Sequence, residues 1–435
     1  SLTATRLVIK MNQILGIDLS LPKLFDVPTI SQLVKKIKEE KKLGMDLFTA
    51  EDLIKDSQLP EGYQVVQDYI PLTRPRKMFF TGATGYLGAY LLNELLRETE
   101  ADIYCLVRAE NEASALIRIK KALSKYGLEM KDEQRIKAIV GDLEKPLFGL
   151  DLTEYNKLAE IIDMIYHNGA MVHFLYPYNV MKPTNVEGTK EVVLFAAAKK
   201  TKPVHYVSTV SVFSEHGMPG KRLISEKSNI DESGILDTGY SQSKWVAERI
   251  IWNAKEKGLP VSVYRVGQVI GDTRSGVSNL DDFIFRTMKG ALESKSYPSN
   301  KGKLSAIAID DVVIAIVRLS LSSRSIGKAY HLLNPCPIMI DSLIMWARQK
   351  GFVLNKTEWE KWVEGLKALG SGSELYPLLP MFPEKIEEDD GEIEFTMQDT
   401  LKDLKEVNVS IHELGDELLS KYYDYFIKVG YLIQP

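Results

Sequence analysis

The chain has 435 residues, of which 45% are hydrophobic and 26% charged, and its formal net charge at pH 7 is −4. This composition is typical of an ordinary globular protein with about two to three domains, and the charge gives no reason to expect binding to nucleic acid or to anionic membranes. No uninterrupted apolar run approaches the ~18 to 20 residues that a bilayer span needs, and the start lacks the basic and apolar segments of a signal peptide. We therefore expect a cytoplasmic protein.

The cysteines and histidines predict neither disulfides nor a metal centre. Cys105 and Cys336 are the only cysteines, and two are too few for a disulfide framework or a cysteine-rich zinc site. Both have apolar neighbours, so we expect buried free thiols in a reducing compartment. His167 and His173 suggest a pair of metal ligands, but the sequence places no third ligand beside them, and we interpret both as cleft or core residues.

Residues 1–42 predict helices that precede the main domain. Ser1 stands as an N-cap in front of apolar residues at helical spacing, Gly16 follows as a stop signal, and a second helix follows the turn LPKLFDVP. About 40 residues bury too little surface to fold alone, so this piece must pack against another or belong to a larger unit. A linker punctuated by prolines and glycine follows at residues 43–76.

From residue 77 the chain alternates between apolar, β-rich runs and helical stretches. The expected strands are KMFFTG, DIYCLVRA, RIKAIVGDL, MIYHNGA, VHYVSTVSVF and VSVYRVGQVIGD, with helices such as AYLLNELLRE and TKEVVLFAAAKK between them. This order predicts a Rossmann-type α/β fold with a doubly wound parallel sheet over residues 77–275. The alternation then weakens, and we expect a smaller, mainly helical C-terminal region at residues 276–435.

The stretch TGATGYLG, between the first strand and first helix of this alternation, is the strongest local signal in the chain. Gly82, Gly85 and Gly88 have the spacing G-x-x-G-x-x-G. Glycines there permit a tight turn and let backbone N–H groups approach a pyrophosphate at the positive end of the helix. A glycine-rich turn without a ligand is the alternative, which the strand before it and the helix after it disfavour.

The end of the next strand predicts which dinucleotide binds. NAD-binding units carry an acidic residue about 20 residues past the glycines, where it binds the ribose hydroxyls. Here DIYCLVRAE ends in Arg108, with Arg118 further on, and an arginine can pair with a ribose 2′-phosphate. We therefore expect NADPH, the alternative being a solvent-facing arginine without this role. Asp142, at the end of another strand, is placed to accept from the adenine amino group.

A tyrosine followed four residues later by a lysine on one helix supplies a proton donor and a charge that lowers the phenol pKa from ~10. The chain has three such pairs: Tyr178/Lys182, Tyr240/Lys244 and Tyr297/Lys301. Prolines on both sides of the first pair argue against a regular helix, and the third lies in a polar stretch that predicts an exposed loop. Only Tyr240 starts a plausible helix, so Tyr240 and Lys244 are the expected catalytic pair.

With these residues in place, the chain resembles the extended short-chain dehydrogenase/reductase family. TGATGYLG, the strand end STV, YSQSK and RVGQVIGD stand in the family's order within residues 77–275. The resemblance implies Thr209 as the hydroxyl partner, Tyr240 as the acid, and Lys244 as its tuner and a ribose contact. The family often has a proline after the arginine of RVGQVIGD, whereas this chain has Val266.

More narrowly, CLVRAENEASALIRI, IYHNGAMVH, HYVSTVSVF and YHLLNP resemble the thioester reductase branch, whose domains close nonribosomal peptide synthetases and related carrier-protein enzymes. The resemblance implies that both arginines serve the NADPH phosphate and that residues 168–170 line the cofactor cleft. The expected cofactor-binding residues are Gly82, Thr84, Gly85, Leu87, Gly88, Arg108, Arg118, Asp142, Leu143, Asn168, Ala170 and Lys244.

The first forty residues carry a resemblance of their own. SLTATRL and LFDVPTISQL resemble the second half of a peptidyl carrier domain, in which the serine of a G-G-[DH]-S-L motif bears phosphopantetheine. This implies a partial carrier domain at residues 1–42, with Ser1 as the attachment point of 4′-phosphopantetheine. A helix N-terminus suits the negative charge of the phosphodiester. An unrelated helical cap is the alternative.

Together these parts imply a reaction. A peptidyl or aminoacyl thioester on the carrier arm enters the cleft, NADPH delivers hydride to its carbonyl carbon, and Thr209 and Tyr240 bind the oxyanion that forms. The product is an aldehyde, which a second NADPH can reduce to an alcohol. Residues 276–435 are expected to bind the substrate, and upstream synthetase modules are the expected partners. The alternatives are a reductase of free acyl-CoA or a nucleotide sugar, release by cyclisation, and an NADP(H)-sensing module.

Overall fold

The computed structural model describes Met11 and residues 49–435, except residues 68, 72–73, 130–131, 174–175, 214–221, 234–235, 237, 299–301 and 383–392. The expected carrier segment at residues 1–42, Ser1 included, therefore lies outside the described residues apart from Met11. The expected linker contains a short helix, α4 (Ala50–Asp56), whose N-cap Thr49 accepts a hydrogen bond from the backbone N–H of Asp52. That linker is thus partly helical.

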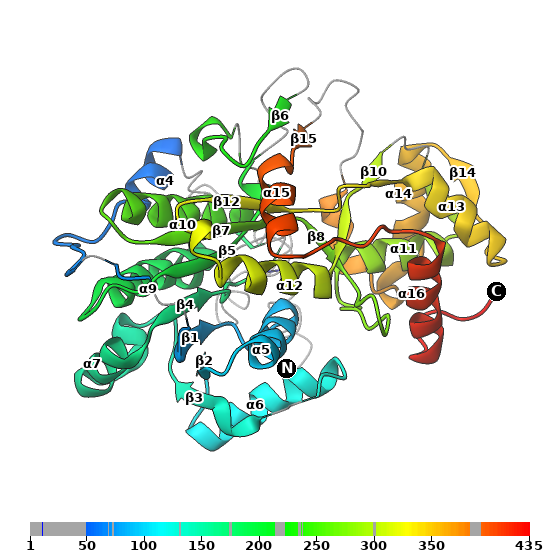
Figure 1. Ribbon diagram of the computed structural model, residues 1–435. Helices are drawn as coiled ribbons and strands as arrows, with labels where there is room; N and C mark the ends of the chain where they lie inside the picture. Colours follow the sequence, from blue (N-terminus) through cyan, green and yellow to red (C-terminus); the bar gives the residue numbers. More distant parts are fainter. Residues whose placement is uncertain are drawn as a thin grey trace, which may run out of the picture.

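Seven strands in the described part of the chain form a parallel central sheet (Figure 1). In spatial order they are β12 (Ala329–Leu332), β7 (Val261–Val266), β5 (Val204–Thr209), β4 (Met164–His167), β1 (Lys77–Thr81), β2 (Asp102–Val107) and β3 (Ile136–Val140). The order reverses between β1 and β4, and doubly wound sheets bind ligands at the carboxyl ends of their strands at such a switch point. The predicted doubly wound parallel sheet is confirmed.

Helices cover both faces of this sheet (Figure 1). One layer consists of α5 (Tyr86–Glu98), α6 (Glu112–Lys125), α12 (Ile309–Ser320) and α15 (Gln398–Glu406), and the other of α7 (Leu152–Ile161), α8 (Tyr178–Lys182), α9 (Gly188–Ala197) and α10 (Gly239–Glu256), with α4 outside them. Successive side chains of β1 pack against opposite helical layers, since Phe80 packs in the first core and Phe79 in the second. In the described part of the chain, no helix is long and apolar enough to span a membrane.

The C-terminal region has an apolar core of its own beside the sheet. Its helices are α11 (Phe283–Glu293), α13 (Ile340–Gln349), α14 (Trp359–Ala368) and α16 (Asp416–Lys428). Short strands pair as β8 (Gln268–Ile270) with β11 (Ala306–Ala308), β9 (Ser296–Pro298) with β14 (Asn355–Thr357), β10 (Lys303–Leu304) with β13 (Ile338–Met339), and β6 (Arg222–Ile224) with β15 (Ile393–Phe395). The rings of Phe285 and Phe426 meet in this core with centroids 5.1 Å apart.

Three local expectations are wrong. Tyr178 does lie in a helix, because Pro177 is the N-cap of α8 and Pro183 opens a π-helical turn that continues into α9. Pro177 lies before the first turn, and at Pro183, which has no backbone N–H to donate, the α-helix changes to a π-turn instead of ending. Tyr297 is buried in β9, where it was expected in an exposed loop. Cys336 is exposed, whereas Cys105 is buried as expected.

One strand of the central sheet, β12, comes from beyond residue 276, where the C-terminal region was expected to begin. Strand β12 pairs in register with β7, with Ala329 opposite Val263. Helix α12, just before it in the chain, packs on α5 within the first core. Helix α12 and strand β12 therefore pack with the central sheet, although the sequence analysis groups both with the C-terminal region.

Candidate functional site

A cleft of about 590 Å³ opens at the carboxyl ends of the central strands, where the strand order reverses. Its lining includes every residue expected for catalysis or cofactor binding: Gly82, Thr84, Gly85, Leu87, Gly88, Arg108, Arg118, Asp142, Leu143, Asn168, Ala170, Thr209, Tyr240 and Lys244. The fold thus brings into one cleft residues that end or follow five strands of the central sheet, β1 to β5. Their individual roles remain predictions.

The glycine-rich turn has a geometry that requires glycine at two positions. Gly82 has φ +83°, and a Cβ there would lie 2.7 Å from the backbone nitrogen of Gly169. A Cβ on Gly88 would lie 1.9 Å from the carbonyl oxygen of Gly82. Helix α5 begins after Gly85, which provides no side-chain cap. Because the first N–H groups of a helix lack intrahelical partners, this uncapped end fits the pyrophosphate of a dinucleotide.

Two arginines line the cleft beyond β2. The side chain of Arg108 is 61% exposed, and its Nη1 lies 3.9 Å from the carboxylate of Glu144. Arg118, on α6, donates through Nη1 to the backbone carbonyl of Arg108, which keeps the two side by side. Asp142 accepts from the backbone N–H of Glu144 at 3.2 Å. The cleft therefore offers a phosphate two positive charges, with one carboxylate competing for them.

His167, at the end of β4, lies within hydrogen-bond distance of residues beside the glycine-rich turn. Its Nδ1 lies 2.8 Å from the hydroxyl of Thr81 and its Nε2 lies 3.0 Å from the hydroxyl of Thr189. The Thr81 hydroxyl also accepts from the backbone N–H of Gly169 at 2.9 Å. Burial lowers the pKa of His167 to about 3, so the ring is neutral. His173 instead stacks on the ring of Tyr176. Among the described residues, no cluster of three or more histidine, cysteine or acidic side chains is placed to hold a metal ion.

The expected catalytic side chains come from β5 and α10. Thr209 is the last residue of β5, Tyr240 the second residue of α10, and Lys244 lies one turn further along that helix. Helix α10 begins after Thr238, whose hydroxyl accepts from the backbone N–H of Ser241. Burial raises the pKa of Tyr240 to about 12, and a hydrogen bond from the Thr209 side chain opposes that rise. The threonine and the tyrosine thus line the cleft from two elements that pack on each other.

Lys244 is directed toward β5. Its amine donates to the hydroxyl of Tyr206 at 2.6 Å and to the carbonyl of Val207 at 2.8 Å. Burial lowers the pKa of Lys244 to about 7, and the charge of Glu248 acts against this. The expected lowering of the Tyr240 pKa by Lys244 is not found in this arrangement, because burial outweighs it and the amine is bonded elsewhere.

The pair Tyr178/Lys182 has a different partner. The Tyr178 hydroxyl donates to one oxygen of Asp56 at 2.8 Å, and the Lys182 amine donates to the other at 2.7 Å. Asp56 ends α4, whose Leu53 is buried in the second core. This pair therefore fastens the linker helix to the domain, and neither residue lines the cleft.

Comparisons with known proteins agree with this geometry. Residues 80–316, more than half of the chain, match an NAD-binding family described as male sterility protein. A component of linear gramicidin synthase from Brevibacillus parabrevis is 36% identical over 446 residues, covering 99% of this chain and 9% of that protein. The terminal R domain from the myxalamid PKS-NRPS biosynthetic pathway is 38% identical with a TM-score of 0.82, covering 88% of this chain and 99% of that one. The R domain of a nonribosomal peptide synthetase from Mycobacterium tuberculosis is 25% identical with a TM-score of 0.69, covering 88% and 97%.

The chain belongs to the reductase domains of nonribosomal peptide synthetases. This confirms the resemblance to the thioester reductase branch of the extended short-chain dehydrogenase/reductase family. The chain spans 9% of the length of the linear gramicidin synthase component and about two fifths of several other curated relatives.

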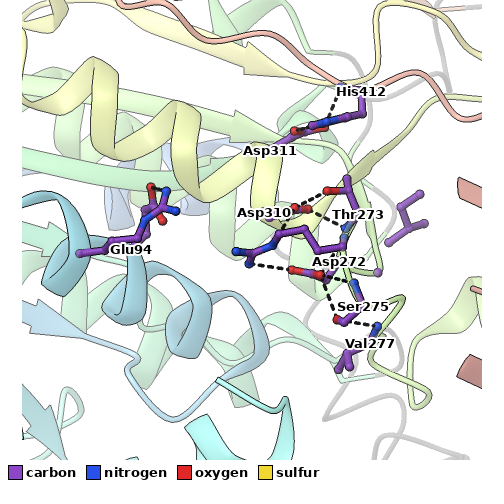
Figure 2. Close-up of polar contacts among 12 residues, drawn as sticks. Glu94, Asp272, Thr273, Ser275, Val277, Asp310, Asp311 and His412 are labelled. Atoms are coloured by element: carbon purple, nitrogen blue, oxygen red, sulfur yellow. Dashed lines mark hydrogen bonds and ion pairs between the residues drawn. The ribbon is translucent and has the colours of Figure 1, made fainter. Parts of the chain in front are cut away.

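The reductase domain has cleft residues that sequence reasoning missed, on the segment after β7. Gly267, Val269 and Asn279 line the cleft from this segment. It turns sharply at Asp272, whose carboxylate accepts from the backbone N–H and the hydroxyl of Ser275 at 2.7 and 2.9 Å. Figure 2 shows this turn. Gly267 and Val269 fall within RVGQVIGD, but nothing in the sequence marks them or Asn279 as cleft residues, because their placement depends on the turn and its tertiary contacts.

That turn is fastened to the first turn of α12 (Figure 2). Asp310 accepts from the backbone N–H of Thr273 at 3.1 Å and from its hydroxyl at 2.5 Å. The adjacent Asp311 accepts from the backbone N–H of His412 at 2.8 Å, and lies 2.7 Å from its ring Nδ1. Two successive acidic residues thus join the cleft segment and the C-terminal chain to one helix end, where negative charge is favourable.

Proposed function

We propose that this reductase domain catalyses the NADPH-dependent release of a carrier-bound peptidyl or aminoacyl thioester as an aldehyde. The observation that carries the proposal is that Thr209, Tyr240 and Lys244 line the same cleft as the glycine-rich turn. The names of its relatives, a linear gramicidin synthase and synthetase R domains, support the substrate class. NADPH bound on the turn supplies the hydride that reaches the thioester carbonyl carbon.

In the proposed reaction, side chains of the cleft stabilise the negative charge on the carbonyl oxygen and supply the proton that it takes up. Thr209 and Tyr240 hydrogen-bond the carbonyl oxygen as negative charge develops on it, and Tyr240 protonates it. The resulting hemithioacetal breaks its C–S bond, so the pantetheine thiol leaves with a proton and the aldehyde remains. The charge of protonated Lys244, one helical turn away, partly offsets the cost that burial imposes on the phenolate left on Tyr240, until solvent returns the proton.

The proposal also assigns residues to the 2′-phosphate of the cofactor and to the acyl group of the thioester. Arg108 and Arg118 bind the 2′-phosphate and so select NADPH, which is supported by the presence of both arginines in the cleft lining and by the hydrogen bond from Arg118 to the backbone of Arg108. Residues 276–435 shape the pocket for the acyl group, in keeping with the cleft contact of Asn279. A second hydride transfer in the same cleft would take the aldehyde to the alcohol.

Replacing the proton donor tests the catalytic role. Tyr240→Phe removes the hydroxyl and nothing else, so NADPH oxidation with an acyl-pantetheine thioester should fall by about 10²- to 10⁴-fold while NADPH binding, followed by fluorescence, persists. Tyr178→Phe is the matched control, because it alters the other helical tyrosine–lysine pair, which lies outside the cleft. Unchanged NADPH oxidation in Tyr240→Phe would contradict the assignment.

The same assay separates the alternatives. Mass spectrometry of the product, together with the NADPH stoichiometry, distinguishes the two products. An aldehyde requires one hydride, and an alcohol requires two. Equal turnover of acyl-CoA and carrier-bound thioesters would favour a reductase of free acyl-CoA. A released product without NADPH consumption would favour cyclisation.

We further propose that residues 1–42 are part of a peptidyl carrier domain with phosphopantetheine on Ser1, and that synthetase modules supply its acyl group. The match with the linear gramicidin synthase component supports this, because it covers 99% of this chain and so extends before residue 49. Incubation with coenzyme A and a phosphopantetheinyl transferase should add one phosphopantetheine to the intact mass of the wild-type chain and none to Ser1→Ala. An unmodified wild-type chain would count against the assignment.

A further inference from the structure

A buried charged pair lies directly behind the catalytic strand end. The side chains of Glu248, on α10, and Arg265, on β7, are 0% and 2% exposed. Arg265 donates to Glu248 Oε1 through Nε at 2.9 Å and through Nη2 at 2.7 Å. The hydroxyl of Ser208 donates to Oε2 at 2.5 Å, and the indole N–H of Trp252 to Oε1 at 3.0 Å. The carboxylate therefore has four donors and no contact with water.

Glu248 is attached to both elements that carry the catalytic group. Its partner Ser208 immediately precedes Thr209 on β5. Glu248 itself lies four residues after Lys244 on α10, and residues at this spacing share one face of a helix. One carboxylate thus holds the strand end that carries the threonine and also lies beside the lysine.

Arg265 extends the contacts to β12. Its Nη1 lies 3.3 Å from Nε2 of His331, and Nδ1 of His331 lies 2.8 Å from the carbonyl oxygen of Thr396. Since a carbonyl can only accept, Nδ1 carries the hydrogen and Nε2 accepts from the guanidinium. The imidazole is therefore neutral. Burial and the charge of Arg265 lower its pKa to about 4.

Glu226 fastens the same C-terminal segment. It accepts from the backbone N–H and the hydroxyl of Thr400, at 2.8 and 2.9 Å, in the first turn of α15. That helix has no side-chain cap of its own, so Glu226 takes the place of one. The backbone carbonyl of Glu226 also accepts from Arg265 at 3.5 Å. Contacts therefore run from β5 and α10, through β7 and β12, to the start of α15.

Stability is a poor explanation for such a pair. Taking two charges out of water costs about as much as their attraction returns, and apolar pairs of similar size are often equally stable. Charged groups beside reacting groups instead point to a functional site. Neither Glu248 nor Arg265 lines the cleft, so each acts through a neighbour.

We propose that Glu248 and Arg265 are positioning residues for the reduction, an inference that rests on the function proposed above. Glu248 holds the strand end that carries Thr209 and presents a negative charge to Lys244. Arg265 balances that charge and connects it to the C-terminal segment. Removing one charge alone therefore changes the electrostatic environment of Lys244, whereas removing both together does not.

The surroundings of Lys244 give the direction of each change. The titratable and hydrogen-bonding groups that face it are Tyr206 and Val207 on β5, His167 on β4, and Tyr240 and Glu248 on α10. Of these, Glu248 brings the negative charge that raises the Lys244 pKa against burial, which lowers it to about 7. Without Glu248 the pKa should fall further, and without Arg265 it should rise.

The test compares the wild-type chain with E248Q, R265Q and the double variant E248Q/R265Q across neutral pH. One readout is NADPH oxidation with an acyl-pantetheine thioester, which declines as Lys244 deprotonates. The other is labelling of Lys244 by trace acetic anhydride, followed by mass spectrometry, which rises as Lys244 deprotonates. We expect E248Q to move both midpoints to lower pH and R265Q to higher pH, each by on the order of one unit. The double variant should return close to the wild-type midpoint.

Matched variants separate charge from structure. R265K keeps the charge and should keep the midpoints. S208A removes a hydrogen bond to the carboxylate without removing a charge, so it should lower kcat without moving the labelling midpoint. R249Q, next to Glu248 on α10, removes an arginine that is paired with Asp231 and should change neither readout.

The outcomes are distinguishable. Coincident labelling midpoints in wild type, E248Q and R265Q overturn the proposal whatever the loss of rate, because a purely structural pair does not move the pKa of Lys244. A wild-type chain that oxidises no NADPH contradicts the proposed function alone, since labelling still reports on Lys244. Where a single variant fails to fold by circular dichroism, the double variant decides. It should keep the midpoint and lose about tenfold or more in kcat, and an unchanged kcat overturns the proposal.

Discussion

Arg108 reaches the cleft with an exposed guanidinium and a carboxylate, that of Glu144, 3.9 Å away. A 2′-phosphate there would replace a weak, exposed ion pair with charge-assisted hydrogen bonds. Arg108→Ala should therefore raise the KM for NADPH by about ten- to a hundredfold and leave the KM for NADH unchanged. Glu144→Gln should lower the KM for NADPH a few-fold, because it removes the competing carboxylate. Steady-state kinetics with both cofactors measure these effects.

The control for this prediction is an arginine in a similar exposed pair away from the cleft. Arg324 pairs with Glu406, and neither residue lines the cleft. Arg324→Ala should leave both KM values unchanged. Equal losses for NADPH and NADH in Arg108→Ala would show that the arginine binds a part that the two cofactors share.

At the scale of elements, the turn after β8 depends on one aspartate of α12 (Figure 2). Asp310→Ala leaves the buried backbone N–H and hydroxyl of Thr273 without their acceptor, and each buried donor left unpaired costs about 1–3 kcal/mol. We expect a drop of that order in the free energy of unfolding, measured with denaturant, and a higher KM for the thioester because Asn279 lies on the same segment. Asp310→Asn keeps one acceptor and should lose less.

Asp281→Ala serves as the control, because Asp281 is 71% exposed in its ion pair with Arg286. Its loss should change the free energy of unfolding little, as exposed ion pairs contribute about 0–1 kcal/mol. A stable Asp310→Ala variant would mean that water replaces the aspartate as acceptor.

The elements also show what a sequence can predict. The turn from β1 to α5 was predictable because part of its requirement is local: Gly82 has φ +83°, and a Cβ on Gly88 would meet the carbonyl oxygen of Gly82 in the same short segment. Helix α10 was predictable from its apolar face, whereas the contexts expected for Tyr178 and Tyr297, which served to set the competing pairs aside, were wrong. The pair Glu248 and Arg265 was not, since only the packing of α10 on β7 makes two charged residues partners. For the same reason β12 was not expected as a strand, although YHLLNP carried part of the resemblance, because its pairing with β7 alone makes four residues a strand of the main sheet.

At the scale of the whole molecule, several contacts hold the C-terminal chain to the rest of the fold, and two of them lead to the cleft. His412 is bonded to Asp311 on α12, and Thr400 to Glu226 beyond β6. The first attachment lies next to the turn that lines the cleft, and the second leads through Arg265 to the catalytic strand end. The proposed acyl pocket and the proposed catalytic residues are thus each connected to the C-terminal segment, so a change in that segment should affect both substrate binding and turnover.

Three buried histidines set the response of the whole fold to acid. Burial lowers the pKa to about 3 for His167 and His205 and to about 4 for His331. All three values lie below the ordinary value near 6.5, so the unfolded chain takes up these protons first as the pH falls. The stability that they contribute is complete above pH ~6.5 and is lost below it. At pH ~5 each histidine costs about 2 kcal/mol, a large share of the roughly 5–15 kcal/mol that folding provides.

The unfolding temperature should therefore fall steeply between pH ~7 and pH ~5, a window that lies above the ordinary carboxylate pKa values of about 4. His205→Gln isolates one of the three protons, because His205 lies in the core against Tyr166 and Tyr264 and outside the cleft. A glutamine does not titrate, so the variant should lose less stability than wild type over the same window, by about 2 kcal/mol. Calorimetry at several pH values measures both slopes. Parallel slopes in the two proteins would show that His205 takes up its proton in the folded state as well, which its burial should prevent.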